Sequence, residues 1–444
     1  MNRFFVGICV VILSFSISGC FVVPNQFTGL APGPWRAVLK LELNPVTPNP
    51  KGEPLPEKLN MEFEEVASGE LPFVFEVVYD SPEQFHLEII NGDERIRADH
   101  IAIGRNRATA KDTIFIDFPV YDSYIQAIYE ENIMEGQWVV RNRENYSIPF
   151  VAKHGQDHRF TQLKKEPILD LSGKWETTFE IDTDAPYKAI GEFQQDGNHL
   201  KGTFLTETGD YRFLEGTVQE NKLYLSVFDG AHAFLFEAKI RPDSTLIGSF
   251  RSGKHYKCIW EARRNDDFEL TDANSLTYLN EGYEKVAFSF ENENGQLVSL
   301  EDDRYQGKIC IVQIFGTWCP NCREETKFLK EYMDANPTYD IEVIALAFEK
   351  RKSKEEAFKA IQRFKENLGV NYEILYAGYY DKTQAAKSLP MLNHILSYPT
   401  MIIMDKKGDI RRIHTGFSGA ATSKYAAFKE DFDQFIQQLA QETI

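Results

Sequence analysis

The chain has 444 residues and a formal net charge of −18. This length exceeds what one hydrophobic core supports, so two or three domains are expected. The acidic excess argues against binding to nucleic acid and against electrostatic attachment to anionic lipid. Beyond the first 20 residues, no apolar run approaches the roughly 20 residues that a membrane-spanning helix needs.

The N-terminus has the pattern of an export signal. A basic start at Arg3 precedes an apolar core over residues 4–15, which is too short to span a bilayer, and then Ile17-Ser18-Gly19-Cys20. The last four residues resemble a lipobox, which implies a lipoprotein signal peptide over residues 1–19 and lipidation of Cys20. An ordinary signal peptide that contains a cysteine is the alternative. Residues 20–34, rich in Pro, Gly and Asn, indicate a lipidated tether. Because no acidic run follows Cys20, we expect anchoring on the periplasmic face of the outer membrane.

Two β-rich domains are predicted next, over residues 35–165 and 170–265. In the first, alternating polarity predicts strands at residues 36–43, 61–66, 73–79, 85–90, 95–103, 113–118, 124–129, 136–140 and 146–151. In the second, strands are predicted at residues 175–181, 187–194, 199–206, 211–218, 223–228, 233–240, 246–251 and 256–262. Their even spacing and tight turns predict antiparallel meanders, and closure into a barrel would remove the exposed edges of the second.

The two β-rich segments look like an internal repeat. Gly33-Pro34-Trp35 matches Gly173-Lys174-Trp175, and Gly136 with residues 146–150 matches Gly248 with residues 256–260. Chance similarity between β sequences is the alternative.

A small barrel can bind an apolar or haem-like ligand, and His199, His232 and His255 are then candidate ligands. We favour aromatic residues as barrel core and these histidines as strand or turn surface residues, and we predict no cofactor.

The last 160 residues alternate strands and helices. After a polar linker over residues 266–283, the domain 284–444 is predicted to begin with a hairpin. The further elements are strands 308–315, 341–348 and 372–376, helices 323–336, 353–368 and 423–441, and a second hairpin made by strands 401–404 and 410–414. Strands alternating with helices imply parallel pairing and an α/β fold.

The motif Cys319-Pro320-Asn321-Cys322 lies between the apolar strand 308–315 and the helix that follows it. Unpaired N–H groups at a helix N-terminus favour a thiolate, and the spacing lets a disulfide close and reopen. Zinc binding is the alternative, but the only later candidate ligands, His394 and His414, lie twenty residues apart. We therefore predict no metal site and favour redox chemistry.

The surroundings of this motif resemble the thioredoxin superfamily, and within it the TlpA-like membrane-associated thiol-disulfide oxidoreductases. The matching segments are residues 295–300, Gly307-Lys308, residues 315–325, residues 398–405 and Lys407-Gly408. The resemblance implies a C-terminal α/β thioredoxin-like fold behind the two mainly antiparallel β domains. It says nothing about those β domains.

Individual roles follow from this placement. Cys319 is expected to be the exposed attacking thiolate and Cys322 the resolving thiol. By resemblance, Pro399 is cis, lies against the cysteine pair and presents the backbone of Tyr398 to a substrate chain; a proline at an ordinary strand start is the alternative. Trp318 is expected to pack beside the thiols as a partly exposed aromatic.

A buried acid found in many thioredoxins six residues before the first cysteine is replaced here by Gln313. Glu325 matches a glutamate near the thiols of TlpA-like reductases, which makes it a candidate proton acceptor. Its alternative is a first-turn helix acid that interacts with the helix dipole. Cys258 and Cys310 fall in strand-like runs and are expected to be buried and inert.

The sequence thus predicts an enzyme that reduces disulfides of exported proteins and is recharged by a membrane electron donor. The alternative is a lipid-anchored binding protein whose β domains bind a ligand or partner and whose thioredoxin-like domain is mainly a docking module. The pattern that peroxiredoxins use around their reactive cysteine is missing from both Cys319 and Cys322.

Overall fold

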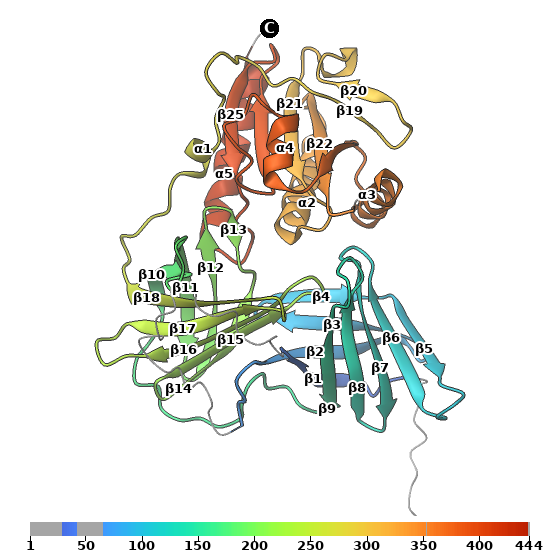
Figure 1. Ribbon diagram of the computed structural model, residues 1–444, viewed down its shortest axis with the longest axis vertical. Helices are drawn as coiled ribbons and strands as arrows, with labels where there is room; N and C mark the ends of the chain where they lie inside the picture. The colour runs from blue at the N-terminus through green and yellow to red at the C-terminus, as the bar shows by residue number, and fades with distance from the viewer. Residues whose placement is uncertain (1–28, 42–64, 352, 443–444) are drawn as a thin grey trace, which may run out of the picture.

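The computed structural model describes residues 29–41, 65–351 and 353–442. These residues form three β-sheets, and Figure 1 shows two of them side by side with the C-terminal sheet and its helices above. The predicted signal peptide, Cys20 and most of the predicted strand 61–66 lie outside the described residues. Among the helices that are described, none is long and apolar enough to cross a membrane.

The first sheet is antiparallel and curls into a half-barrel (Figure 1). Its strands are β1 (Gly33–Lys40), β2 (Glu70–Ser81), β3 (Gln84–Asn91), β4 (Glu94–Ala98), β5 (Ile101–Arg105), β6 (Asp112–Phe118), β7 (Ser123–Glu130), β8 (Ile133–Val140) and β9 (Ser147–His154). Their order is β4-β3-β2-β1-β9-β8-β7-β6-β5, so β4 and β5 are the edges. The single strand predicted over residues 95–103 is wrong, because a tight turn in which the Ile101 N–H donates to the Asp99 carbonyl at 2.9 Å divides it.

The second sheet closes into a barrel. Its strands are β10 (Gly173–Phe179), β11 (Tyr187–Asp196), β12 (His199–Thr206), β13 (Gly209–Asp210), β14 (Leu214–Gln219), β15 (Lys222–Phe228), β16 (Ala233–Ile240), β17 (Leu246–Ser252) and β18 (Tyr256–Arg264). Closure comes from β11, which pairs with β12 as well as with β10. The predicted barrel is therefore confirmed.

Aromatic side chains fill the barrel. Phe204, Phe236 and Trp260 are fully buried, and the rings of Phe236 and Phe250 stack with centroids 4.4 Å apart. This packing supports the interpretation of these aromatics as core rather than as the wall of a ligand cavity.

The strand registers support the internal repeat. Gly136 lies opposite Phe150 in the first sheet, and Gly248 lies opposite Trp260 in the barrel, as the sequence correspondence requires. The indole N–H groups of the two matching tryptophans also donate to a carbonyl four residues earlier, at 2.9 Å for Trp35 and 2.8 Å for Trp175. The half-barrel and the barrel therefore share the same local structure at these positions.

The half-barrel and the barrel pack against each other through β15 and β2. The rings of Phe73 and Phe228 stack with centroids 4.4 Å apart. Arg159 is buried at this contact, where it donates to Ser226 Oγ at 2.9 Å and to Asn91 Oδ1 at 3.0 Å. A guanidinium held by both sheets fixes their relative position.

The C-terminal sheet is mixed, with β21, β22 and β23 parallel. Its strands, in the order β20-β19-β23-β22-β21-β24-β25, are β20 (Leu297–Ser299), β19 (Ser289–Glu291), β23 (Glu373–Tyr379), β22 (Ile341–Glu349), β21 (Ile309–Phe315), β24 (Thr400–Met404) and β25 (Ile410–Thr415). The helices are α1 (Ala273–Leu276), α2 (Pro320–Ala335), α3 (Lys354–Leu368), α4 (Lys382–Ser388) and α5 (Lys424–Gln441). This is the α/β fold that the resemblance implied.

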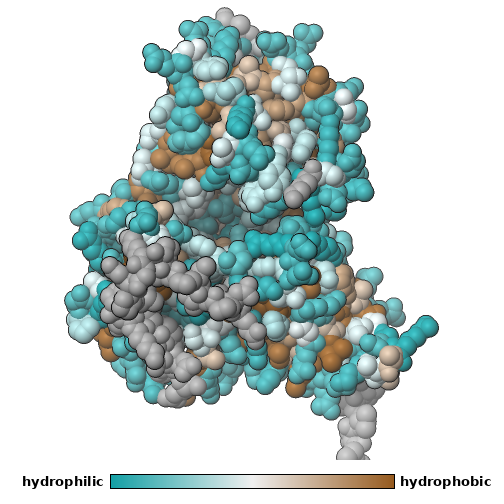
Figure 2. Space-filling model, viewed as in Figure 1, coloured by the Kyte–Doolittle hydropathy of each residue, from teal (hydrophilic) through white to brown (hydrophobic). Residues whose placement is uncertain are grey.

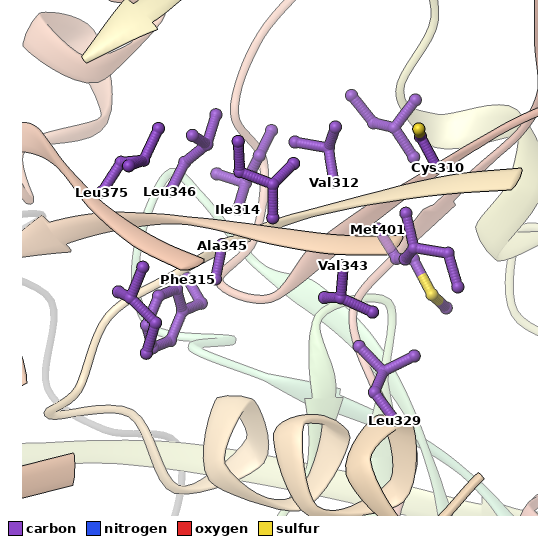
Figure 3. Close-up of a cluster of buried hydrophobic side chains, with 14 of the residues drawn as sticks. Cys310, Val312, Ile314, Phe315, Leu329, Val343, Ala345, Leu346, Leu375 and Met401 are labelled. Atoms are coloured by element: carbon purple, nitrogen blue, oxygen red, sulfur yellow. The ribbon is translucent and has the colours of Figure 1, made fainter. Parts of the chain in front are cut away.

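Alternating residues of the central strands cover both faces of this sheet. Figure 3 shows Val312, Ile314 and Leu346 on one face and Phe315 and Val343 on the other, where Leu329 of α2 packs. Burial on both faces explains why β21 and β22 are almost continuously apolar.

Two parts of the C-terminal region differ from the prediction. The predicted linker 266–283 contains α1 and contacts the domain, since Thr277 Oγ1 and Thr415 Oγ1 lie 2.7 Å apart. Helix α4 was not predicted, because only Ala385 among its residues is buried and seven residues show no helical period.

Candidate active site at the start of α2

The two thiols lie at the start of α2, directly after the buried strand β21. Pro320 is the first helical residue, a position where its missing N–H costs no hydrogen bond. Cys319 is the N-cap, and its Sγ accepts a hydrogen bond from the Cys322 N–H at 3.3 Å. Both cysteines are free thiols.

The two thiols have opposite pKa shifts. Burial raises the pKa of Cys319, but hydrogen bonds from the Cys322 side chain and N–H and the positive charge of Lys350 outweigh burial, so the pKa is lowered overall. Burial and the neighbouring Cys319 raise the pKa of Cys322 well above its ordinary value. The pair therefore holds its negative charge on Cys319.

Glu325 is fully buried beyond the first turn of α2. Its Oε2 accepts from Gln313 Nε2 at 2.9 Å, and its Oε1 has no hydrogen-bond partner among the described residues. Burial raises the pKa of Glu325 to about 8; the Gln313 hydrogen bond opposes this shift and the charge of Cys319 adds to it. The alternative of a first-turn helix acid is wrong, since α2 has no acid in its first turn.

The segment before β24 closes the other side of the pair. The Tyr398–Pro399 peptide bond is cis, and the Cys319 Sγ lies 3.3 Å from the Tyr398 carbonyl oxygen, to which the protonated thiol donates. Trp318 is partly buried, donates its indole N–H to the Phe348 carbonyl at 2.9 Å and lies edge-on to the Tyr398 ring, with centroids 5.6 Å apart. The structure therefore brings Trp318, Tyr398 and Pro399 together around Cys319.

The structure corrects the expectation that Cys319 is exposed. Only 7 % of its surface is accessible. Residues 207–210, which are the turn after β12 and the two residues of β13, lie against this face of the C-terminal domain; we call them the tip loop (Figure 1). Ser397 Oγ donates to the Thr208 carbonyl at 3.0 Å, and a Cβ on Gly209 would lie 2.0 Å from Asn321 Nδ2. A substrate strand would therefore meet the tip loop beside the cysteine pair.

Ion pairs fix the same face to both β sheets. Arg212 of the barrel is buried, pairs with Glu324 of α2 and also reaches Glu94 of β4 at 2.7 Å. Arg323 of α2 donates to the Tyr121 hydroxyl of the half-barrel at 3.1 Å. On the face seen in Figure 2, hydrophilic residues cover the boundary between the C-terminal domain and the sheets. The C-terminal domain, the barrel and the half-barrel therefore meet at the start of α2.

Sequence reasoning missed Glu349 and Lys350. Glu349 is buried and accepts from the Thr317 N–H at 2.9 Å and from Thr317 Oγ1 at 2.8 Å; burial raises its pKa to about 7. The Lys350 ammonium lies 4.0 Å from the Trp318 ring centroid. Both residues follow the predicted strand 341–348 at the carboxyl edge of the parallel sheet, which is the signal that could have identified them.

The other two cysteines among the described residues lie in strands. Cys258 and Cys310 are buried, and burial raises their pKa to about 11 and about 12. Among the described residues, no three metal-ligating side chains gather in one place.

Known proteins match the region that carries this site. The profile of the AhpC/TSA family matches residues 282–413. The thioredoxin-like protein YneN of Bacillus subtilis is 31 % identical over 159 residues, which are 35 % of this chain and 81 % of YneN. The C-terminal domain belongs to the thioredoxin-like family. The thiol-disulfide oxidoreductase ResA of Halalkalibacterium halodurans is 24 % identical over 135 residues, which are 30 % of this chain and 68 % of ResA.

Solved structures match the same thioredoxin-like domain. A secreted thiol-disulfide isomerase from Corynebacterium glutamicum is 19 % identical, with 39 % of this chain and 98 % of that chain covered and a TM-score of 0.28. A thiol:disulfide interchange protein DsbE of Chlorobium tepidum is 18 % identical, covers 37 % of this chain and 99 % of its own, and has a TM-score of 0.28. The thioredoxin-like domain of this chain is thus similar to thiol-disulfide oxidoreductases of the ResA type.

Proposed function

We propose that this protein is a membrane-anchored, periplasm-facing reductase that reduces disulfides of exported proteins through Cys319 and Cys322. The observation that carries the proposal is the position of the two thiols at the start of α2: Cys319 is the N-cap and accepts from the Cys322 N–H at 3.3 Å. The pKa of Cys319 is accordingly lowered and that of Cys322 raised. Such a pair separates the attacking sulfur from the resolving one.

The reaction has two exchange steps. The Cys319 thiolate attacks one sulfur of the substrate disulfide, which forms a mixed disulfide and releases the other substrate sulfur as a thiolate. Cys322 then loses its proton and attacks the Cys319 Sγ, which releases the second substrate sulfur and forms the Cys319–Cys322 disulfide. Two electrons pass to the substrate. A membrane electron donor then supplies two electrons that reduce the Cys319–Cys322 disulfide again.

Glu325 is the proposed acceptor of the Cys322 proton. With a pKa of about 8, its carboxyl can both take and release a proton near neutral pH. Its Oε1 has no hydrogen-bond partner among the described residues and can receive the proton.

Trp318, Tyr398 and Pro399 are the proposed substrate-binding residues. The Tyr398 carbonyl contacts the Cys319 sulfur and can pair with an extended substrate backbone, and the Trp318 ring lies against Tyr398. The tip loop covers this face, so a protein substrate must displace residues 207–210.

Anchoring is proposed through a lipid on Cys20, on the periplasmic face of the outer membrane. The motif before Cys20 supports it. Labelling cells with a radioactive fatty acid tests it: the wild-type protein should carry the label, and labelled Cys20→Ser protein would contradict the anchor.

Insulin reduction tests the enzyme. Cys319→Ser should abolish turnover, whereas Cys310→Ser, which removes a buried thiol outside the pair, should retain it. Cys322→Ser should accumulate mixed disulfides with its substrates. A measured potential near that of a strong oxidant would contradict the reductive direction.

One observation favours the second candidate, a binding protein whose thioredoxin-like domain is mainly a docking module. The β sheets occupy the face of the C-terminal domain that a substrate would use. If cellular function survives Cys319→Ser, the docking function is correct and the reductase function is not.

A further inference from the structure

A hollow of about 70 Å³ lies where the three sheets meet. The C-terminal domain contributes Trp318 and Lys350 to its wall, the half-barrel contributes Arg143, and the barrel contributes His232 and His255. Trp318 directly precedes Cys319. Burial raises the pKa of Cys319, but hydrogen bonds from Cys322 and, next, the charge of Lys350 lower it. The hollow is therefore adjacent to the redox pair.

The wall of the hollow is cationic although the protein is acidic overall. Of the described residues that line it, none is Asp or Glu. Arg143 and Lys350 make cation–π contacts, with Tyr146 at 5.1 Å and Trp318 at 4.0 Å, but neither has an ion-pair partner among the described residues. Only His232 has a carboxylate beside it, Asp229 at 3.1 Å.

The positive charges of Arg143 and Lys350 repel each other. Burial and Arg143 lower the pKa of Lys350 to about 8, against the opposing charges of Cys319 and Glu349. Desolvation, followed by Arg143, Lys350 and His232, lowers the pKa of His255 to about 4, so this histidine is neutral near pH 7. An anion in the hollow would relieve this repulsion.

The wall also offers an unused donor. Trp138 is 2 % exposed and lines the hollow, and its indole N–H has no hydrogen-bond partner among the described residues. A buried N–H without an acceptor costs free energy, and an anion supplies an acceptor.

We propose that this hollow binds a carboxylate of the disulfide-bearing substrate, next to the bond that Cys319 attacks. The inference rests on the proposed redox function and adds a preference for acidic substrates. The volume admits a carboxylate group and not a whole peptide, so the group reaches in from a substrate that lies outside. It belongs either to an acidic side chain of a protein or to a low-mass disulfide acid.

Two pairs of matched substrates test the preference. Dithiodiglycolate and 2-hydroxyethyl disulfide differ in charge, and a disulfide peptide with Glu beside its cysteine differs from its Gln analogue in the same way. The wild-type protein should reduce the anionic member with a kcat/KM about tenfold higher, the effect of one charged hydrogen bond. Arg143→Gln should lose most of that ratio, whereas Arg105→Gln, an exposed arginine on β5, should retain it.

The outcomes separate the sources of the carboxylate. Preference for the acidic peptide alone supports a protein carboxylate, and preference for dithiodiglycolate alone supports a low-mass acid. No preference in either pair, or a preference that survives Arg143→Gln, overturns the proposal. Turnover of 2-hydroxyethyl disulfide by the wild-type protein shows in the same assay that the redox function stands.

Binding without turnover gives a second readout. The pKa of His255 can be measured by NMR of histidine-labelled full-length protein. Acetate should raise this pKa in the Cys319→Ser variant but not in the double variant Cys319→Ser, Arg143→Gln. A His255 pKa unmoved by saturating acetate overturns the hollow as an anion site and leaves the role of the cysteines untouched.

Discussion

At the scale of single residues, Glu325 links the chemistry of the site to the stability of the domain. Its pKa is about 8 in the folded protein against an ordinary value of 4.5, chiefly because it is buried. Between these two values the folded protein holds a proton that the unfolded chain has released. Stability is therefore lost as the pH rises through this window.

We predict that Glu325→Gln removes this loss. The melting temperature of the variant minus that of the wild type should be larger at pH 9 than at pH 5, by roughly 5 °C. Glu349, whose pKa burial also raises, is present in both proteins and cancels. Glu331→Gln, an exposed acid on the same helix, is the control and should show no such trend. A constant difference across this pH range would mean that Glu325 is ionised throughout.

At the scale of elements, the tip loop determines access to Cys319. A Cβ at Gly209 would lie 2.0 Å from Asn321 Nδ2. The φ of Gly209 is +142°, a backbone conformation that is strained for a residue with a side chain. We predict that Gly209→Ala displaces the loop and speeds alkylation of Cys319 by iodoacetamide about tenfold or more. Gly197→Ala, in the β11–β12 turn at φ +58° with no atom within 4 Å, is the matched control. Equal rates in the two variants would show that the tip loop does not shield the thiol.

The elements show what the sequence could predict. Strands such as β6 follow from alternating polarity and turn residues, which are local signals. The positions of Cys319 and Cys322 follow from a motif between a strand and a helix. The tip loop could not be predicted, because Thr208 meets Ser397 across 189 residues and neither segment carries a pattern that specifies the other. The burial of Cys319 was missed for the same reason.

At the scale of the whole molecule, Arg212 connects the three sheets. Its buried guanidinium pairs with Glu94 of the half-barrel at 2.7 Å, with Asp229 of the barrel at 3.6 Å and with Glu324 of the C-terminal domain. Burial raises the pKa of Glu94 to about 7 despite the attraction of Arg212. Without Arg212, Glu94 would lose its cationic partner, whereas Asp229 would keep His232 at 3.1 Å.

We predict that Arg212→Ala uncouples the thioredoxin-like domain from the β sheets. Breaking a buried ion pair costs about 3–5 kcal/mol, because the remaining charges are left without a partner. Calorimetry should show a separate, earlier transition in place of joint unfolding, and alkylation of Cys319 should be faster at temperatures where the protein remains folded. Arg105→Ala, which removes an exposed pair with Asp112 at 3.5 Å, should change neither property. If Arg212→Ala lowers the melting temperature but leaves the alkylation rate unchanged, the ion pairs stabilise the barrel without controlling access to the redox pair.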